Sequence, residues 1–186
     1  MTSKIKVNIL ADGGDNSIIT SDGAGSFTAS SGLASSVQSV GGLQNTPAFL
    51  AFASQNSFSI NTRSTVTYSS EVFDTDSVYN TSTYTFTVPS GKAGKYLFTV
   101  HTRMEQLDYR NDFVQQIIKT SNREYVFTID PRGWDVTTSY WSFTQSVVAD
   151  MDDLDTARIE VYVSGSYGSP LWQGESYFSG CKLIGA

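Results

Sequence analysis

Cysteine, histidine and long apolar runs are scarce in this 186-residue sequence, and each scarcity excludes a class of protein. The one cysteine, Cys181, cannot form the intrachain disulfide framework that stabilises many small secreted domains. The single histidine, His101, cannot combine with one cysteine into a zinc site within one chain, because such sites need about four ligands. No run of about 18 apolar residues occurs, so we expect no membrane-spanning helix.

Charged residues are also scarce, and acidic residues outnumber basic ones. Charged residues make up 16% of the sequence, the formal net charge is -6, and the pI is about 4.6. An acidic chain repels phosphate groups, and its Lys and Arg residues are scattered singly, so we expect no nucleic-acid partner and no membrane partner. The start, MTSKIKVNILADGG, lacks the apolar core of a signal peptide, which predicts synthesis in a cytoplasm without standard export.

The abundant residues favour β-structure. Aromatic residues reach 13%, and Thr, Tyr, Phe and Val suit pleated strands whereas Ser, Asn and Gly suit turns. Strand-like runs follow one another from residue 45 onwards without a convincing amphipathic helix, which predicts an all-β jelly-roll β-sandwich over residues 45–186. These runs are AFLAFAS, TVTYSSEVF, STYTFTV, KYLFTVHTRM, DFVQQIIKT, REYVFTI, SYWSFTQSVVA, ARIEVYVSG and SYFSGCKLIG.

Residues 1–44 form a separate region that is poorer in large side chains. KIKVNIL alternates between apolar and polar residues, SIITS and SFTAS are short strand candidates, and ADGGDN and DGAG predict turns between them. Such short strands cannot bury a core alone, so we expect an arm that lies on a partner or entwines with its own copies. The candidate anchoring residues are Ile5, Val7, Ile9, Ile18 and Phe27. Residues 31–44 have the Ser and Gly content of a linker.

The segment SGKAGK, residues 90–95, resembles a phosphate-binding loop in composition only. A P-loop requires Ser or Thr directly after Gly-Lys and then a helix, whereas Tyr96 and a strand-like run follow here. We therefore predict a turn between two strands. Residues Tyr84, Phe86 and Val88 alternate on the first strand, and Tyr96, Phe98 and Val100 on the second.

The acidic run DMDDLD is the candidate metal site. Calcium prefers several carboxylate ligands, which Asp150, Asp152, Asp153 and Asp155 offer. The run lacks the glycine and the glutamate that an EF-hand places at its sixth and twelfth positions, so a solvated turn is favoured over a calcium site. No other cofactor is expected.

The loop DPRGWD is the candidate receptor contact. Arg132 and Trp134 lie in a Gly- and Pro-containing segment, where exposed side chains can bind a host-surface glycan or protein. No G-x-S-x-G motif occurs, and no carboxylate pair stands out, so an enzyme such as a glycan depolymerase is disfavoured. We expect His101 to be a packed or surface residue, with a ring of His101 side chains around a symmetry axis as the alternative.

Several short motifs occur in a specific order along residues 45–186. They are PAFLAFAS at 47–54, F-x-x-P at 86–89, G-x-Y-x-F at 94–98 and F-S-G-x-x-L-I at 178–184. In this order they resemble the globular head of the collagenous complement subunits, the trimeric jelly roll shared with tumour necrosis factor. The resemblance implies a homotrimer in which aromatic residues fill the core or the trimer interface. These are Tyr84, Phe86, Tyr96, Phe98 and Phe178.

The sequence departs from this family at three points. The turn between Pro89 and Gly94 is longer than usual, Cys181-Lys182 replaces a bulky apolar residue, and no collagen repeat precedes the head. Residues 17–30, SIITSDGAGSFTAS, resemble instead the short β-repeats of fibre and capsid-decoration proteins of tailed bacteriophages.

Together the two resemblances imply a non-enzymatic phage protein, made in the host cytoplasm and located on the virion. It would be a trimeric capsid decoration (cement) or head-fibre protein that binds the major capsid protein or another virion protein through residues 1–44. The alternative is the receptor-binding tip of a tail fibre, which recognises a host glycan or surface protein.

Overall fold

The computed structural model describes residues 9–21, 23–24, 26–30, 46–134 and 140–183. The chain divides into two units, the arm (residues 1–44) and the head (residues 45–184), each described by itself. Apart from one 3-10 turn, η1 (Pro131–Trp134), all regular elements of the described residues are strands, which confirms the all-β prediction. Within the same residues, no helix is long and apolar enough to cross a membrane.

The described part of the arm is a three-stranded antiparallel sheet. Its strands are β1 (Ile9–Ala11), β2 (Ser17–Ser21) and β3 (Phe27–Ala29), and β2 lies in the middle. The turn before β2 is organised by Asp12, whose carboxylate accepts hydrogen bonds from the backbone N–H groups of Gly14 and Asn16. Two of the candidate anchoring residues, Ile5 and Val7, and the candidate linker 31–44 lie outside the described residues.

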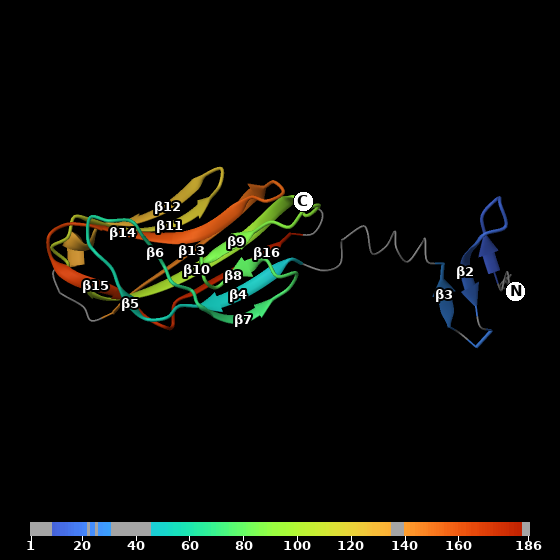
Figure 1. Ribbon diagram of the computed structural model, residues 1–186, viewed down its shortest axis with the longest axis horizontal. Helices are drawn as coiled ribbons and strands as arrows, with labels where there is room; N and C mark the ends of the chain where they lie inside the picture. Colours follow the sequence, from blue (N-terminus) through green and yellow to red (C-terminus); the bar gives the residue numbers. More distant parts are fainter. Residues whose placement is uncertain (1–8, 22, 25, 31–45, 135–139, 184–186) are drawn as a thin grey trace, which may run out of the picture. The chain divides into compact units, whose positions relative to one another are not determined.

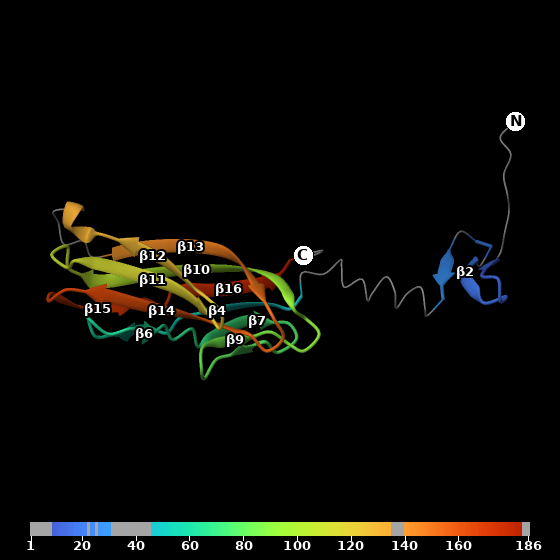
Figure 2. The same cartoon turned by 90° about the horizontal axis from the view of Figure 1, so that it is seen from above.

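The head contains two antiparallel sheets. The first, the β10 sheet, has the strand order β5-β15-β10-β16-β4-β7, and β13 pairs with β10 on its other side. Figure 2 shows β13 running beside β10, and the two strands pair from Gly94–Met151 to Glu105–Tyr140. The strands are β4 (Ala48–Phe52), β5 (Asn56–Ser57), β7 (Ser70–Asp74), β10 (Gly94–Leu107), β13 (Tyr140–Met151), β15 (Gly168–Trp172) and β16 (Tyr177–Lys182).

The second sheet, the β11 sheet, has the order β12-β11-β14-β9-β8, and β6 also pairs with β14. Its strands are β6 (Ser64–Thr65), β8 (Tyr79–Asn80), β9 (Thr85–Thr87), β11 (Phe113–Thr120), β12 (Glu124–Ile129) and β14 (Thr156–Ser164). Figure 1 shows the two sheets as layers of the head. The run DFVQQIIKT forms strand β11, as its β-branched residues predict.

The core lies between the sheets and is rich in aromatic rings. Along β10 every second residue from Tyr96 to Met104 is fully buried, which is the period-two pattern of a strand with one covered face. Phe49 and Phe178 pack edge to face with ring centroids 4.9 Å apart, and Phe86 packs against Phe98 at 5.2 Å. Burial of each such ring contributes about 1.5–3 kcal/mol relative to exposure.

Two strand predictions are wrong in detail. The run TVTYSSEVF is not one strand, because β6 and β7 belong to different sheets and the buried residues Val66 and Tyr68 lie between them. Tyr84 does not continue the alternation of Phe86. It lies in a turn with φ of 58°, because the Asn80 side chain accepts hydrogen bonds from the backbone N–H groups of Ser82 and Thr83 and turns the chain there.

Candidate interaction surfaces

The outer face of the β10 sheet carries no Asp, Glu, Lys or Arg across its centre. Pairing places Leu97 between Val148 and Cys181, and His101 between Thr144 and Tyr177. All side chains of this surface, the uncharged face, are half-buried or exposed. The uncharged face consists of Ala48, Leu50, Phe52, Leu97, Thr99, His101, Thr144, Ser146, Val148, Tyr177, Ser179 and Cys181.

Charged residues occur at both ends of the uncharged face. Lys95 pairs with Asp150 in the register of β10 and β13 at one end. At the other end, Arg103 Nη1 donates to Glu175 Oε1 over 2.8 Å, and the Arg103 guanidinium lies 4.0 Å from the centre of the Tyr140 ring. A centre without charges and a polar rim is the anatomy of a protein–protein interface.

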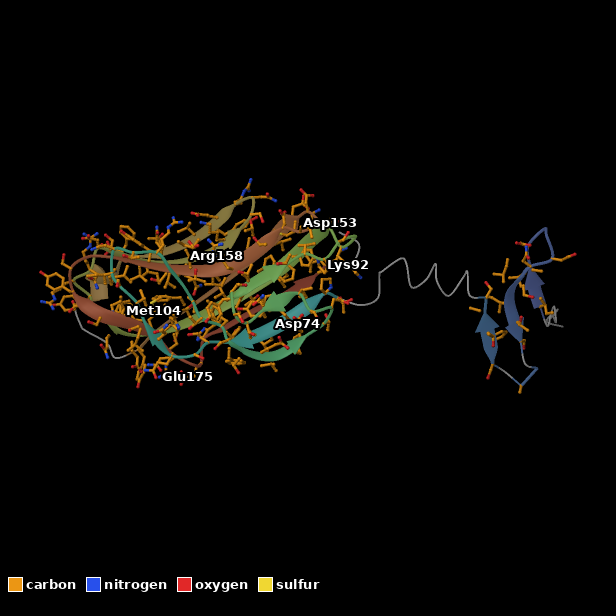
Figure 3. The ribbon with its side chains drawn as sticks, viewed as in Figure 1. Asp74, Lys92, Met104, Asp153, Arg158 and Glu175 are labelled. Carbon is orange, nitrogen blue, oxygen red and sulfur yellow. The ribbon has the colours of Figure 1, made fainter. Side chains whose placement is uncertain are left out.

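The outer face of the β11 sheet is the opposite case, because it carries a dense cluster of ion pairs. Glu160 has a side chain only 7% exposed and accepts hydrogen bonds from Arg158 Nε at 2.9 Å and Nη2 at 2.7 Å. Lys119 lies 3.7 Å from Glu160, and Arg63 contacts both Glu160 and Glu124. Figure 3 labels Arg158 in this layer. These charges pair with one another within one chain.

His101 lies near the middle of the uncharged face, between β13 and β16. Its Nδ1 lies 2.9 Å from Thr144 Oγ1, and its ring stacks on Tyr177 with centroids 5.4 Å apart. Burial, followed by the nearby Arg103 charge, lowers the pKa of His101. Cys181 lies on the same face, and burial raises the pKa of its thiol, which disfavours the reactive thiolate.

The turn SGKAGK does bind an anion, and that anion is the Asp153 carboxylate. The backbone N–H groups of Gly91, Lys92 and Ala93 all donate to Asp153, over 2.8, 3.2 and 3.0 Å. Figure 3 shows Lys92 and Asp153 close together at one end of the head. Burial raises the pKa of Tyr96 to about 12, and its neutral hydroxyl donates to the Lys92 carbonyl over 2.7 Å, which fixes the turn further.

The four acidic residues proposed for calcium do not converge on one point. Asp153 binds the SGKAGK turn, and Asp155 accepts hydrogen bonds from Asp152 N and from Asn122 Nδ2. Asp150 lies on β13 opposite Lys95. Among the residues that the structure describes, no group of three or more His, Cys, Asp and Glu side chains is able to hold a metal ion. The run therefore organises a turn, and the calcium interpretation gains no support.

The candidate receptor loop lies at the other end of the head, where β10 and β12 end. Arg132 is exposed and binds Asp130 through Nε at 2.9 Å and Nη2 at 2.7 Å, which lowers the pKa of Asp130 to about 2. The backbone of Trp134 ends η1, whereas its side chain lies outside the described residues.

The same end of the head has a second Asp-x-Arg pair, which sequence reasoning missed. Asp108 binds Arg110 with distances of 2.9 and 2.7 Å, and the Arg110 guanidinium lies 4.0 Å above the Tyr167 ring. The fully buried Asn111 holds this arrangement, since its side chain bonds both the N–H and the carbonyl of Tyr167. The motif D-x-R occurs at residues 108–110 and again at 130–132, and this repetition could have pointed to the second pair from the sequence alone.

A shallow groove of about 400 Å³ lies beside β8. It is lined by Ser77, Val78, Tyr79, Asn80, Thr81 and Thr87. Tyr79 is the only lining residue with a titratable side chain, and burial raises its pKa while its hydroxyl donates to the Tyr68 carbonyl over 3.0 Å. These side chains provide neither a carboxylate pair nor a nucleophile with a base, so the groove lacks the groups of a hydrolytic site.

The arm exposes apolar side chains on both faces of its sheet. Strand pairing places Leu10, Ile19 and Phe27 on one face, whereas Ile9 and Ile18 lie on the other. Phe27 is 73% exposed, and Ile9 and Leu10 are each more than half exposed. A sheet this small cannot cover both faces with its own residues. Of these residues, Leu10 and Ile19 were not among the sequence candidates.

No protein-family model matches the sequence, and a search of curated proteins finds no match either. Solved structures do match. The globular domain of zebrafish complement 1qA protein aligns with a TM-score of 0.54 and 16% identity over 74% of this chain and 98% of its own. Murine APRIL aligns with a TM-score of 0.52 and 11% identity over 73% and 98%.

The vertex protein P5 of PRD1 aligns with a TM-score of 0.53 and 14% identity over 73% of this chain and 96% of its own. Identities this low establish the fold alone. The head therefore has the jelly-roll fold of complement heads and of tumour-necrosis-factor-like proteins, as the motif order in the sequence predicts.

Proposed function

We propose that this chain is a non-enzymatic structural protein of a bacteriophage particle. In this proposal it is a homotrimer whose arm binds the virion and whose jelly-roll heads project from it, as a capsid decoration (cement) or head-fibre protein. One observation carries the proposal: a head with the fold found in the PRD1 vertex protein P5 is joined to an arm whose described strands expose Ile9, Leu10 and Phe27. Such a protein needs a scaffold, and a capsid shell provides one.

The contrast between the two faces of the head supports the homotrimer. The β11 sheet presents ion pairs to water, whereas the β10 sheet presents the uncharged face with its charged rim. Val148 and Tyr140 on the β10 side are each about half exposed in the single chain. Three copies arranged around a three-fold axis form a closed assembly, which avoids open filaments. The resemblance to trimeric heads favours this arrangement over a dimer.

The arm supports attachment to a virion protein, with the major capsid protein as the leading partner. Its two apolar faces fit a position between neighbouring copies on one side and the shell on the other. A protein that binds only assembled capsids stabilises the assembled state through mass action. A decoration protein would thereby strengthen the shell across the boundaries between its subunits.

Substitution of the arm's apolar residues tests the attachment. Full-length protein with Leu10→Ser, Ile19→Ser and Phe27→Ser is mixed with undecorated capsids of the parent phage, and bound protein is measured by co-sedimentation. We expect this variant to lose capsid binding. A variant that lacks residues 2–30 should lose it as well. The matched control, Thr20→Ser with Thr28→Ser, should bind like the wild type. If the triple variant binds capsids with wild-type affinity, the proposed attachment through the arm is wrong.

A receptor-binding fibre tip is the second candidate, and the two Asp–Arg pairs with Tyr167 favour it. They place ordered, exposed guanidinium groups and an aromatic ring at one end of the head. Copy number separates the two functions, since a decoration protein covers the shell whereas a fibre tip occurs in a few trimers. Loss of host-cell binding in the Arg110→Ala and Trp134→Ala variants would favour the fibre tip, and unchanged binding would count against it.

A further inference from the structure

His101 lies on the surface through which the proposed trimer assembles. It is on β10, two residues from Thr99 near the middle of the uncharged face, with Tyr177 on one side and Thr144 on the other. Its ring stacks on Tyr177, and its Nδ1 lies within hydrogen-bond distance of Thr144 Oγ1. When a second copy covers this face, the ring loses water and its charged form becomes less favourable.

The groups around His101 do not compensate an imidazolium charge. On its own strand Arg103 adds a like charge, and on the other elements Thr144, Tyr177 and Phe52 are uncharged. Two carboxylates lie toward this end of the face: Glu175 is already paired with Arg103, and Glu105 lies four residues further along β10, beyond Arg103. The π face of Tyr177 attracts a cation, but this weak effect is smaller than the loss of water from a charged ring.

We propose that His101 makes the trimer of this protein sensitive to acid, so that protonation of three His101 side chains separates the subunits. The proposal rests on the trimer of the proposed function and adds a means to regulate it. The imidazole is neutral in the assembled state, and each subunit takes up one proton when it leaves. Assembly is therefore complete at neutral and higher pH, and it weakens as the pH falls through the lowered pKa of His101.

The linkage predicts a steep response. Dissociation of one trimer is coupled to the uptake of three protons, one by each His101. Below the pKa of His101 in the free subunit, the trimer dissociation constant therefore rises by up to about 1,000-fold for each pH unit. A response with only one linked proton would rise by about 10-fold for each unit.

Sedimentation equilibrium of the full-length chain between pH 8.0 and pH 5.0, at constant ionic strength, tests the proposal. We expect wild-type trimers at pH 8.0 that separate into folded subunits at the acidic end, with circular dichroism as the check on folding. The His101→Gln variant keeps a hydrogen-bonding side chain for Thr144 without a titrating ring, and we expect it to stay trimeric throughout. Wild-type trimers that persist at pH 5.0, or a variant that separates at the wild-type pH, would overturn the switch and leave the trimer intact. A wild-type monomer at pH 8.0 would contradict the trimer and the switch together.

A second readout does not depend on the variant. Because His101 is the only histidine, its imidazole C–H signals in NMR report one titration without ambiguity. We expect a lower pKa in concentrated, trimeric samples than in dilute samples that contain single subunits. An equal pKa in the two states would refute the linkage.

Discussion

Asp153 and Gly91 are 62 residues apart in the sequence, yet the Asp153 carboxylate accepts a hydrogen bond of 2.8 Å from the Gly91 backbone N–H. The same carboxylate binds the next two backbone N–H groups of the turn. The turn between Pro89 and Gly94 therefore wraps around the carboxylate with three consecutive N–H groups. The chain fills its own anion-binding turn, so that turn serves the fold rather than a phosphate ligand.

The first prediction concerns this contact. Asp153→Ala removes the acceptor of three N–H groups and should lower the midpoint of thermal unfolding at pH 7 by a few degrees. The backbone hydrogen bonds, that from Gly91 first, lower the pKa of Asp153. The Asp153 carboxylate thus stabilises the head above the pKa that it has in the unfolded chain. This stabilisation is lost as the pH falls through its lower pKa in the folded protein.

The difference between wild type and Asp153→Ala should therefore shrink in acid. Asp152→Ala is the control, because Asp152 precedes Asp153 in the chain while the N–H groups of the turn donate to Asp153, and this change should have little effect. An unfolding midpoint equal to that of the wild type at pH 7 would show that the contact does not stabilise the head.

The second prediction concerns Gly180, the glycine of the motif F-S-G. A Cβ atom there would lie 2.6 Å from Phe98 Cδ1 and 2.8 Å from Phe49 Cε1, which is closer than packed atoms allow. Gly180→Ala should lower the free energy of unfolding by about 1–3 kcal/mol, the usual effect of overpacking a core. Urea denaturation measures this. Gly174→Ala is the matched control, since its nearest neighbour would be the Ala53 carbonyl at 3.5 Å. Equal stability of the two variants would contradict the packing argument.

The third prediction compares two carboxylates of the ion cluster on the β11 sheet. Glu160 is almost buried and accepts two hydrogen bonds from Arg158, whereas Glu124 is one-third exposed. Glu160→Gln should lower the free energy of unfolding by about 1.5–3 kcal/mol, because the amide removes the negative charge with which the neighbouring cations pair. Glu124→Gln should cost less than about 1 kcal/mol, as is usual for exposed pairs. A larger effect of Glu124→Gln in denaturant titrations would reverse the order and refute this account.

The fourth prediction locates the trimer interface. Val148 and Val126 are exposed to a similar extent, 50% and 45%, but Val148 lies on the uncharged face and Val126 on the β11 sheet. Val148→Lys places a charge in the proposed contact and should raise the trimer dissociation constant by at least about 100-fold, since an unpaired buried charge is strongly unfavourable. Val126→Lys should leave it unchanged. Native mass spectrometry and sedimentation measure the dissociation constants of both variants. A larger effect of Val126→Lys than of Val148→Lys would place the interface on the β11 sheet instead.

Strands with a local apolar or β-branched pattern could be predicted from the sequence. β10 and β11 were found because their burial follows local patterns of apolar and β-branched residues. Strand β15 was missed, because Gly168-Ser169-Pro170 looks like a turn and only the pairing with β10 and β5 makes it a strand. The division of TVTYSSEVF between two sheets was likewise decided by tertiary packing around Tyr68.

The candidate surfaces were less predictable than the strands, because they depend on contacts between distant segments. The sequence showed an acidic run and a Gly-Lys turn as separate features, and only the fold brings Asp153 to the turn. The uncharged face needs the register of four strands, which no local pattern supplies. Arg132 was found from loop composition alone, but Arg110 and Tyr167 become neighbours only through the buried side chain of Asn111.

A map of the parent phage particle by electron cryomicroscopy tests the central claim most directly. The account predicts three-lobed projections on the shell, each fitted by three heads that turn their β10 sheets toward a common axis. Density for the arms should lie against the capsid proteins. Projections with a single lobe, heads that meet through their β11 sheets, or a particle that lacks this chain would contradict it.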